Sequence, residues 1–320
     1  MSRAGKVALT VVTLVLLLVL GTALYVWMRP LAVSAWFERR ALAKAGFTSS
    51  VMESPSGRMT VWEAGQGPTI VLLHGAGDQA GAWSLVAPQL TGKYRVLIPD
   101  LPGHADSFPR EGPLPLGTVL GGVNALMEQK AGNQPVILVG NSMGAWLAIL
   151  YARDHPDRVA RIVAVDGGPL RGRQDVSLLP RDREEARKLM ALLRDGGNPP
   201  VPDFVLDDVV RYSRNGPIGR LLADVPEMER YLLDGKLGDF RTPVDLVWGE
   251  ADRLLDLEYA RRMEAQLPAV RLTVLSRCGH VPLRECPSGL TTALERVLSE
   301  PPPETRPATE IGTPAKPTQP

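Results

Sequence analysis

Short apolar runs of strand length recur along most of the chain. Most are continuous stretches of aliphatic and β-branched residues, a pattern typical of strands that are covered on both faces. Segments with helical periodicity, such as 145–153 and 254–266, separate these runs. Strands that alternate with helices indicate an α/β fold with a mostly parallel central sheet flanked by helices. The predicted strands are 69–73, 94–99, 136–139, 161–165, 244–248 and 270–275.

The alternation stops between residues 168 and 241. This stretch is polar and helical in pattern, and it contains no strand-like run. Open α/β sheets bind ligands at the carboxyl ends of their strands, so an insert between two strands is expected to cover that edge. We therefore expect residues 168–241 to form a helical cap inserted before the strand at 244–248.

The N-terminal segment 1–30 predicts a membrane anchor. Val7–Met28 is 22 residues long without a charge, and a bilayer core needs about 20 such residues. A cleaved signal peptide is the alternative, because Arg3 and Lys6 form a basic start, but its apolar part would be only about 7–15 residues long. Basic residues stand on both sides of the run, so the side of the membrane that holds the body stays open.

The remaining boundaries follow from composition. Residues 31–56 predict an amphipathic linker, in which Trp36 and Phe37 stand among basic residues and suit a membrane interface. The α/β core is expected at 57–167 and 242–300. Residues 301–320 are rich in proline and poor in apolar residues, which predicts a disordered tail.

Charge and cysteine content exclude several classes of protein. The net charge of +1 gives no basic field for nucleic acid. The two cysteines, Cys278 and Cys286, are too few for a disulfide framework or a cysteine-rich zinc module. We expect them to be small buried thiols, with a disulfide as the alternative if the body is exported.

The candidate chemistry begins at Gly140-Asn141-Ser142-Met143-Gly144. This G-x-S-x-G pattern lies between a predicted strand and a predicted helix, which is the context of a nucleophile elbow. A sharp, strained turn there would project the Ser142 hydroxyl above the sheet. The sequence therefore predicts Ser142 as a nucleophile.

A serine nucleophile needs a base, and the base needs a carboxylate. Of the four histidines, His280 follows the last predicted strand in a short loop and is the expected base. Asp252 follows the strand at 244–248, which gives the chain order Ser, Asp, His expected for this architecture. Three other acidic residues are rivals for the role of the acid: Glu250, Asp256 and Asp166.

Ester chemistry also needs donors for the developing oxyanion. The backbone N–H of Met143 follows the nucleophile at the start of a helix and is one expected donor. The glycine-rich loop after the strand at 69–73 should supply the other, with the N–H of Ala76 as the candidate. No metal or organic cofactor is expected.

Four motifs together resemble the α/β-hydrolase superfamily: "LLHGAGDQAGAW", "DLPGHADS", "GNSMGAW" and "WGEADRLLD…CGH". The resemblance implies the α/β-hydrolase fold and an oxyanion hole at Ala76 and Met143. With the N-terminal span, the chain looks most like membrane-anchored esterases and lipases of the monoacylglycerol-lipase type. Ser142 argues against the dehalogenases and epoxide hydrolases of this fold, which use aspartate.

The favoured function is the hydrolysis of carboxylic esters, with lipid-derived monoesters such as monoacylglycerols as substrates. Two alternatives stay open: a carbon–carbon bond hydrolase of the meta-cleavage-product type with the same triad, and a catalytically silent membrane-anchored binding protein. The oligomeric state is not predicted. The expected walls of an acyl pocket are the apolar cap residues Leu189, Met190, Leu192, Leu193, Val205 and Leu206.

Overall fold

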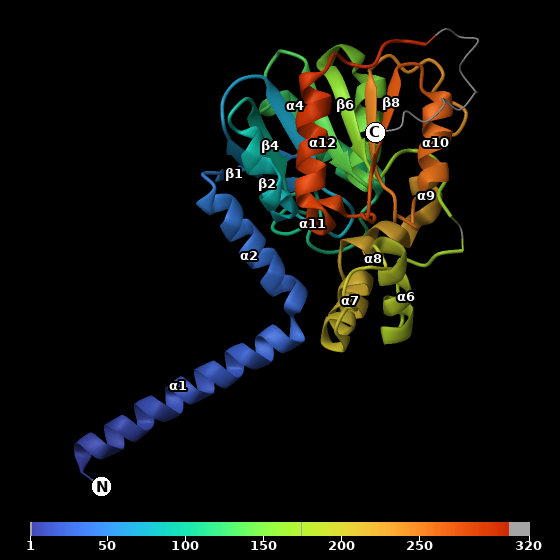
Figure 1. Cartoon of the computed structure of the whole chain (residues 1–320). Helices are drawn as coiled ribbons and strands as arrows, with labels where there is room; N and C mark the ends of the chain where they lie inside the picture. The colour runs from blue at the N-terminus through green and yellow to red at the C-terminus, as the bar shows by residue number, and fades with distance from the viewer. Residues whose placement is uncertain (1, 174, 307–320) are drawn as a thin grey trace.

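A single eight-stranded sheet lies at the centre of the protein (Figure 1). The computed structural model describes residues 2–173 and 175–306. The strand order is β1-β2-β4-β3-β5-β6-β7-β8, and every pairing from β4 onward is parallel. The predicted α/β-hydrolase fold class is confirmed. The strands are β1 Thr48–Ser54, β2 Gly57–Ala64, β3 Thr69–Leu73, β4 Arg95–Pro99, β5 Val136–Asn141, β6 Val159–Val165, β7 Val244–Gly249 and β8 Val270–Leu275.

Helices cover both faces of the sheet, which explains the continuous apolar runs. In β3, Ile70 and Leu72 join a core that includes residues of α12, whereas Val71 and Leu73 join a second core with α4 and α5. The helices of the α/β core are α3 Ala87–Leu90, α4 Leu116–Gln129, α5 Met143–Asp154, α10 Leu257–Gln266, α11 Pro282–Glu285 and α12 Pro287–Ser299, with 3₁₀ turns η1 Ala80–Leu85 and η2 Pro156–Arg158.

The predicted helical cap is also confirmed, because only helices connect β6 to β7 in the described residues of this stretch. In Figure 1, α6 to α8 lie together beyond one end of the sheet. Ala186, Leu206 and Val209 form a small core of their own, so α6 and α7 pack against each other. The cap elements are α6 Arg183–Leu193, α7 Asp203–Asn215, α8 Pro217–Leu221, η3 Leu222–Asp224 and α9 Val225–Glu229.

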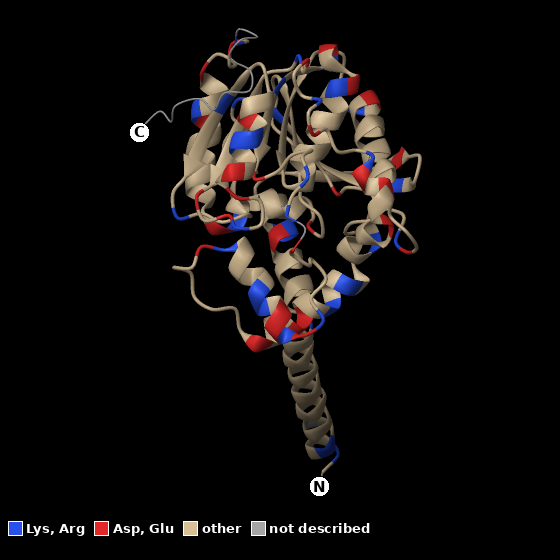
Figure 2. Cartoon of the chain, turned by 90° about the vertical axis from the view of Figure 1, so that its right-hand side faces the viewer, with Lys and Arg blue, Asp and Glu red and all other residues tan. Residues whose placement is uncertain are grey.

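Helix α1, Arg3–Met28, stands clear of the body (Figure 1). Its most apolar window has a mean hydropathy of 2.7 and is not buried by the protein. Beyond its first turn it carries no charged residue, while charges are spread over the body (Figure 2). By length and composition α1 can cross a membrane, although a signal sequence would look the same.

The chain turns sharply after α1, and α2, Pro30–Lys44, runs back to the sheet at β1 (Figure 1). The junction touches the cap. Trp27 stacks on Phe204 of α7 with ring centroids 4.6 Å apart, and the N–H of Leu31 donates to Asp208 Oδ2 at 3.0 Å. The two N-terminal helices therefore meet the body at the cap as well as at the sheet edge.

Two predicted boundaries need correction. The amphipathic linker predicted at 31–56 is helical in α2, but it also contains the whole of β1, which pairs antiparallel with β2. The strand gave little signal because Met52 is its only buried residue. At the other end, residues 301–306 reach back to the body, where Arg306 donates to the carbonyl of Leu267 at 2.6 Å. The rest of the predicted tail, 307–320, lies outside the described residues.

Candidate active site

Ser142 lies at a strained turn between β5 and α5. Its backbone has φ +53° and ψ −117°, in the left-handed half of conformational space that costs a non-glycine residue about 1–3 kcal/mol. The two flanking glycines are required by packing. A Cβ on Gly140 would lie 2.2 Å from the backbone of Gly144, and one on Gly144 would lie 2.2 Å from the carbonyl oxygen of Leu73. The elbow predicted from the sequence is present, and Ser142 lies at its apex.

The structure brings Ser142, His280 and Asp252 into one hydrogen-bonded chain. Ser142 Oγ lies 3.0 Å from His280 Nε2, and His280 Nδ1 lies 2.7 Å from Asp252 Oδ2. The other carboxylate oxygen of Asp252 accepts the N–H groups of Leu254 and Leu255 at 2.8 and 3.0 Å. The three residues thus come from three separate loops, at the carboxyl ends of β5, β7 and β8.

The rival acids occupy other positions. Asp256 caps the N-terminus of α10 by accepting the N–H of Tyr259 at 3.1 Å. Glu250 is exposed and accepts the N–H of Arg277 at 3.4 Å. Asp166 is fully buried beside Asp252, and its Oδ1 accepts the N–H of Gly249 at 2.7 Å. Of these carboxyl groups, only that of Asp252 is bonded to His280.

Two of the other histidines shape the loop that follows β3. His74 Nδ1 lies 2.8 Å from the carbonyl oxygen of Gly75, and His104 Nε2 accepts the N–H of Gly77 at 3.1 Å. Burial lowers the pKa of His74 and lowers that of His104 to about 3, so both imidazoles are neutral at pH 7. They fix the backbone on both sides of Ala76.

A cavity of about 560 Å³ opens above Ser142. Ala76 and Met143, the residues predicted to supply the oxyanion donors, line it together with Ser142. A Cβ on Gly75 would lie 3.3 Å from Cβ of Ser142, which shows how closely this loop approaches the serine. Among the described residues, no group of three or more His, Cys, Asp or Glu is placed to hold a metal ion.

The walls of the cavity differ from those predicted. None of the six predicted cap residues lines it. Met190 and Leu206 instead pack in the small core between α6 and α7, which Leu31 of α2 completes. The apolar lining that the cap contributes comes from the segment before α6 and from the later cap elements: Leu170, Val176, Leu178, Leu179, Ile218, Leu221, Leu222, Val225, Met228 and Leu232.

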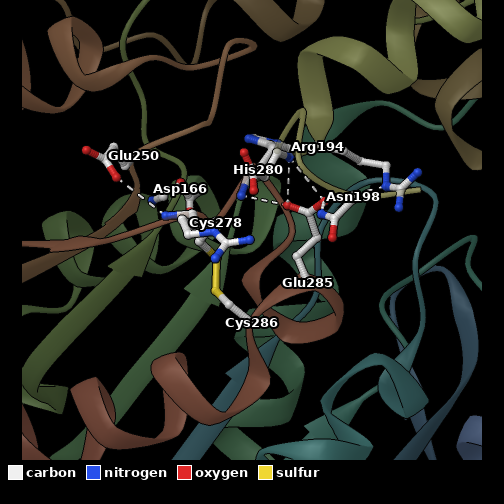
Figure 3. The surroundings of a disulfide bond; sticks show 12 residues. Asp166, Arg194, Asn198, Glu250, Cys278, His280, Glu285 and Cys286 are labelled. Carbon is white, nitrogen blue, oxygen red and sulfur yellow. Dashed lines mark hydrogen bonds and ion pairs between the residues drawn. A yellow bond between two sulfur atoms is a disulfide. The ribbon is translucent and has the colours of Figure 1, made fainter. Parts of the chain in front are cut away.

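Cys278 and Cys286 form a disulfide, which corrects the expectation of two buried thiols (Figure 3). The cysteines are eight positions apart, and the short helix α11 folds the chain back so that their Cα atoms lie 5.8 Å apart. His280 lies inside the closed loop. The bridge therefore restrains the segment that carries the imidazole.

Glu285 ties the same loop to the cap, a role that the sequence did not indicate. Its buried carboxylate accepts the N–H of Gly279 at 2.6 Å and the side-chain amide of Asn198 at 2.7 Å, and Arg194 lies 3.5 Å away (Figure 3). The N–H of His280 also donates to the carbonyl oxygen of Leu193 at 2.8 Å. The end of α6 and the histidine loop are thus one bonded unit.

The chain is similar to known proteins in both sequence and structure. The model of the Alpha/beta hydrolase family matches residues 70–293. A solved structure described as a membrane phospholipase A, a bacterial virulence factor, is 27% identical with a TM-score of 0.72, and the alignment covers 92% of this chain and 98% of that one.

Two curated relatives have different substrates. The 2-hydroxy-6-oxo-6-phenylhexa-2,4-dienoate hydrolase of Burkholderia cepacia is 28% identical over 70% of this chain and 85% of its own length. The pimeloyl-[acyl-carrier protein] methyl ester esterase of Aromatoleum aromaticum is 28% identical over 72% and 98%. These relatives include both an ester hydrolase and a dienoate hydrolase.

Removing the disulfide should destabilise the protein. Closing a loop of this length is worth about 2–3 kcal/mol on the chain-entropy model, so a Cys278→Ala/Cys286→Ala variant should unfold several degrees below the native chain. Thermal unfolding measures the shift, and Ser299→Ala on α12 serves as a surface control. Two free thiols in the native chain, titrated in denaturant without reductant, would contradict the bridge.

Proposed function

The chain belongs to the alpha/beta hydrolase family, and on that premise we propose that it is a serine hydrolase that cleaves carboxylic esters through an acyl-enzyme on Ser142. The hydrogen-bonded chain from Ser142 Oγ through His280 to Asp252, opening into a mostly apolar cavity, is the observation that carries the proposal. The match to the family spans most of the core and supports the proposal.

In the proposed reaction, Ser142 Oγ attacks the ester carbonyl while His280 Nε2 takes its proton. Asp252 holds the imidazole with Nδ1 protonated and stabilises the imidazolium. The imidazolium then protonates the leaving alcohol, and a water activated by the same His280 releases the acid. All of the proton transfers pass through one side chain.

The oxyanion of each tetrahedral intermediate needs two backbone donors. The N–H of Met143 begins α5, where the first-turn N–H groups have no partner inside the helix and the helix dipole favours negative charge. The N–H of Ala76 is the proposed second donor, on a loop whose shape His74 and His104 hold. Because these donors are set before substrate binds, they stabilise charge without reorganisation.

Lipid-derived esters, with monoacylglycerols preferred, are the proposed substrates. The cavity walls contributed by the cap are largely aliphatic, which suits an acyl chain. The solved structure described as a membrane phospholipase A is similar over nearly the whole chain and supports a membrane lipid as the source of the ester. A membrane anchor would also hold the enzyme where such esters are concentrated.

We further propose that α1 is retained as the anchor, rather than cleaved. Cleavage after Ala35 would remove Trp27 and Leu31, which bond the junction to α7 of the cap. On α2, Trp36 and Phe37 are 49% and 61% exposed and are proposed to rest in the membrane interface. The disulfide favours a body on the oxidising side of the membrane.

A carbon–carbon bond hydrolase is the second candidate. The Burkholderia cepacia relative hydrolyses a dienoate by its name, and such a reaction would use the same three residues. The aliphatic cavity and the N-terminal helix favour the lipid ester. Comparing the rate of hydrolysis of p-nitrophenyl esters with that of a dienoic diketone separates these two candidates. Absence of labelling by a fluorophosphonate probe would instead favour a catalytically silent binding protein.

Ser142→Ala should abolish ester turnover and fluorophosphonate labelling while leaving the unfolding temperature nearly unchanged. The triad acts as a unit, so kcat should fall on the order of 10³-fold or more. Asp252→Asn should lower kcat by a comparable factor, because the amide selects the wrong imidazole tautomer. Asp256→Asn, which keeps its helix cap, is the matched control. A nearly silent Asp252→Asn would show that the acid has been misassigned.

For a series of linear esters, kcat/KM should rise severalfold per carbon over the first few carbons, since each buried methylene contributes about 0.8 kcal/mol. Met228→Trp should narrow the cavity and move the optimum to shorter chains without loss of butyrate turnover. An enzyme that hydrolyses acetate esters best, with rates falling as the chain lengthens, would exclude the lipid substrate.

The full-length chain should stay in the membrane fraction after an alkaline wash, with its N-terminus intact by mass spectrometry. A soluble mature chain that begins near residue 36 would show that α1 is a signal peptide. A variant with Trp27→Ala and Phe204→Ala tests the contact with the cap, and it should lower the unfolding temperature without releasing the protein.

A further inference from the structure

Asp166 is buried at the point where the nucleophile turn and the acid loop meet. It directly follows β6, and its backbone has φ +44°, a strained value for a residue with a side chain. Its N–H donates to the carbonyl oxygen of Val247 at 3.1 Å, and its Oδ1 accepts the N–H of Gly249 at 2.7 Å. The carbonyl of Gly249 in turn accepts the N–H of Asp252 at 3.2 Å.

The neighbouring residue is as tightly constrained. A Cβ on Gly167 would lie 2.2 Å from the carbonyl oxygen of Ser142. The N–H of Ser142 donates to the carbonyl oxygen of Val165 at 2.9 Å. Residues 165–167 therefore touch the nucleophile on one side and the turn before Asp252 on the other.

The second oxygen of Asp166 has no donor. Asp166 Oδ2 is buried and finds no hydrogen-bond partner among the described residues, and the carboxyl group of Asp252 is its neighbour. Two ionised carboxylates in contact and out of water repel each other, so one of them holds a proton. Asp252 already accepts two N–H groups and His280 and is the better anion.

We propose that Asp166 is a neutral carboxylic acid whose Oδ2 hydroxyl donates to the Asp252 carboxylate and holds it in line with His280. Asp166 is then a positioning residue of the triad, and this inference rests on the proposed function. The hydrogen bond gives the orphaned oxygen a partner and adds one more donor to Asp252. A carboxylic acid kept neutral by its surroundings is a strong hydrogen-bond donor.

The electrostatic surroundings of Asp166 also favour its neutral form. Burial, followed by the charge of Asp252, raises the pKa of Asp166 well above its usual range, and the carboxylate of Glu285 on α11 adds to the rise. The N–H of Gly249 acts in the opposite direction. Two carboxylates therefore raise the pKa of Asp166, and one backbone donor lowers it.

The raised pKa of Asp166 predicts how the stability of the folded chain changes with pH. The unfolded chain ionises Asp166 near pH 4, whereas the folded chain keeps its proton, so stability is lost as the pH rises from that range through the folded pKa. Asp166→Asn removes this dependence and keeps both an acceptor for Gly249 and a donor for Asp252. Asp166→Ala removes the donor as well.

The test combines kcat, fluorophosphonate labelling rate and unfolding temperature for the two variants. Asp166→Asn should keep kcat and labelling within about threefold of the native chain, whereas Asp166→Ala should lose about tenfold or more in both with KM little changed, as for a lost buried hydrogen bond to a charged group. The unfolding temperature of Asp166→Asn should equal or exceed the native value at pH 7, with a margin that grows from pH 5 to pH 8.

An ionised Asp166 would give the opposite pattern. If Asp166→Asn loses as much activity as Asp166→Ala, or unfolds at a lower temperature than the native chain throughout this pH range, the proposal is overturned. The labelling rate and the unfolding temperature need no substrate. Failure of ester turnover with labelling retained would therefore reject the proposed ester substrate and leave the role of Asp166 standing.

Discussion

The close packing of backbone against backbone at the elbow is the constraint on which the site depends. Gly140, Gly144 and Gly167 each lie where a single added carbon would come within 2.2 Å of main-chain atoms. No side-chain movement can relieve such contacts, so these positions fix the path of β5 into α5 and the place of β6 beside it. The tight packing at these three glycine positions holds the backbone of Ser142 at an unfavourable positive φ.

The histidine loop is held in a different way, by bonds rather than by packing. The disulfide closes the loop on itself, and Glu285 and Leu193 join it to the end of α6. On the far side of the imidazole, the acid loop is bonded to the cap through Arg253, whose N–H donates to the carbonyl oxygen of Leu192 at 3.0 Å. The cap is therefore not an independent lid at this end: movement of the α6 terminus would also move His280 and the turn that carries Asp252.

The sequence predicted what depends on local pattern and chain order. Strands buried on both faces leave continuous apolar runs, and the order of Ser142, Asp252 and His280 is set by the fold. It could not predict what depends on contacts between distant segments. Met190 and Leu206 read as pocket walls, but α2 completes a separate core with them. The Cys278–Cys286 bridge needed the fold of α11, and β1 was too exposed to leave a pattern.

If α1 is the retained anchor that we propose, the contact of Trp27 with Phe204 has a kinetic consequence. A helix of 26 residues is about 39 Å long, longer than a hydrocarbon core of about 30 Å, so with α1 in a bilayer its last turns lie at the level of the lipid headgroups. The cap touches those turns and is held at the same level. With the proposed anchor and the proposed lipid-ester substrate, the enzyme would search for substrate in two dimensions, and its rate would follow the mole fraction of the ester in the leaflet rather than its concentration in bulk water.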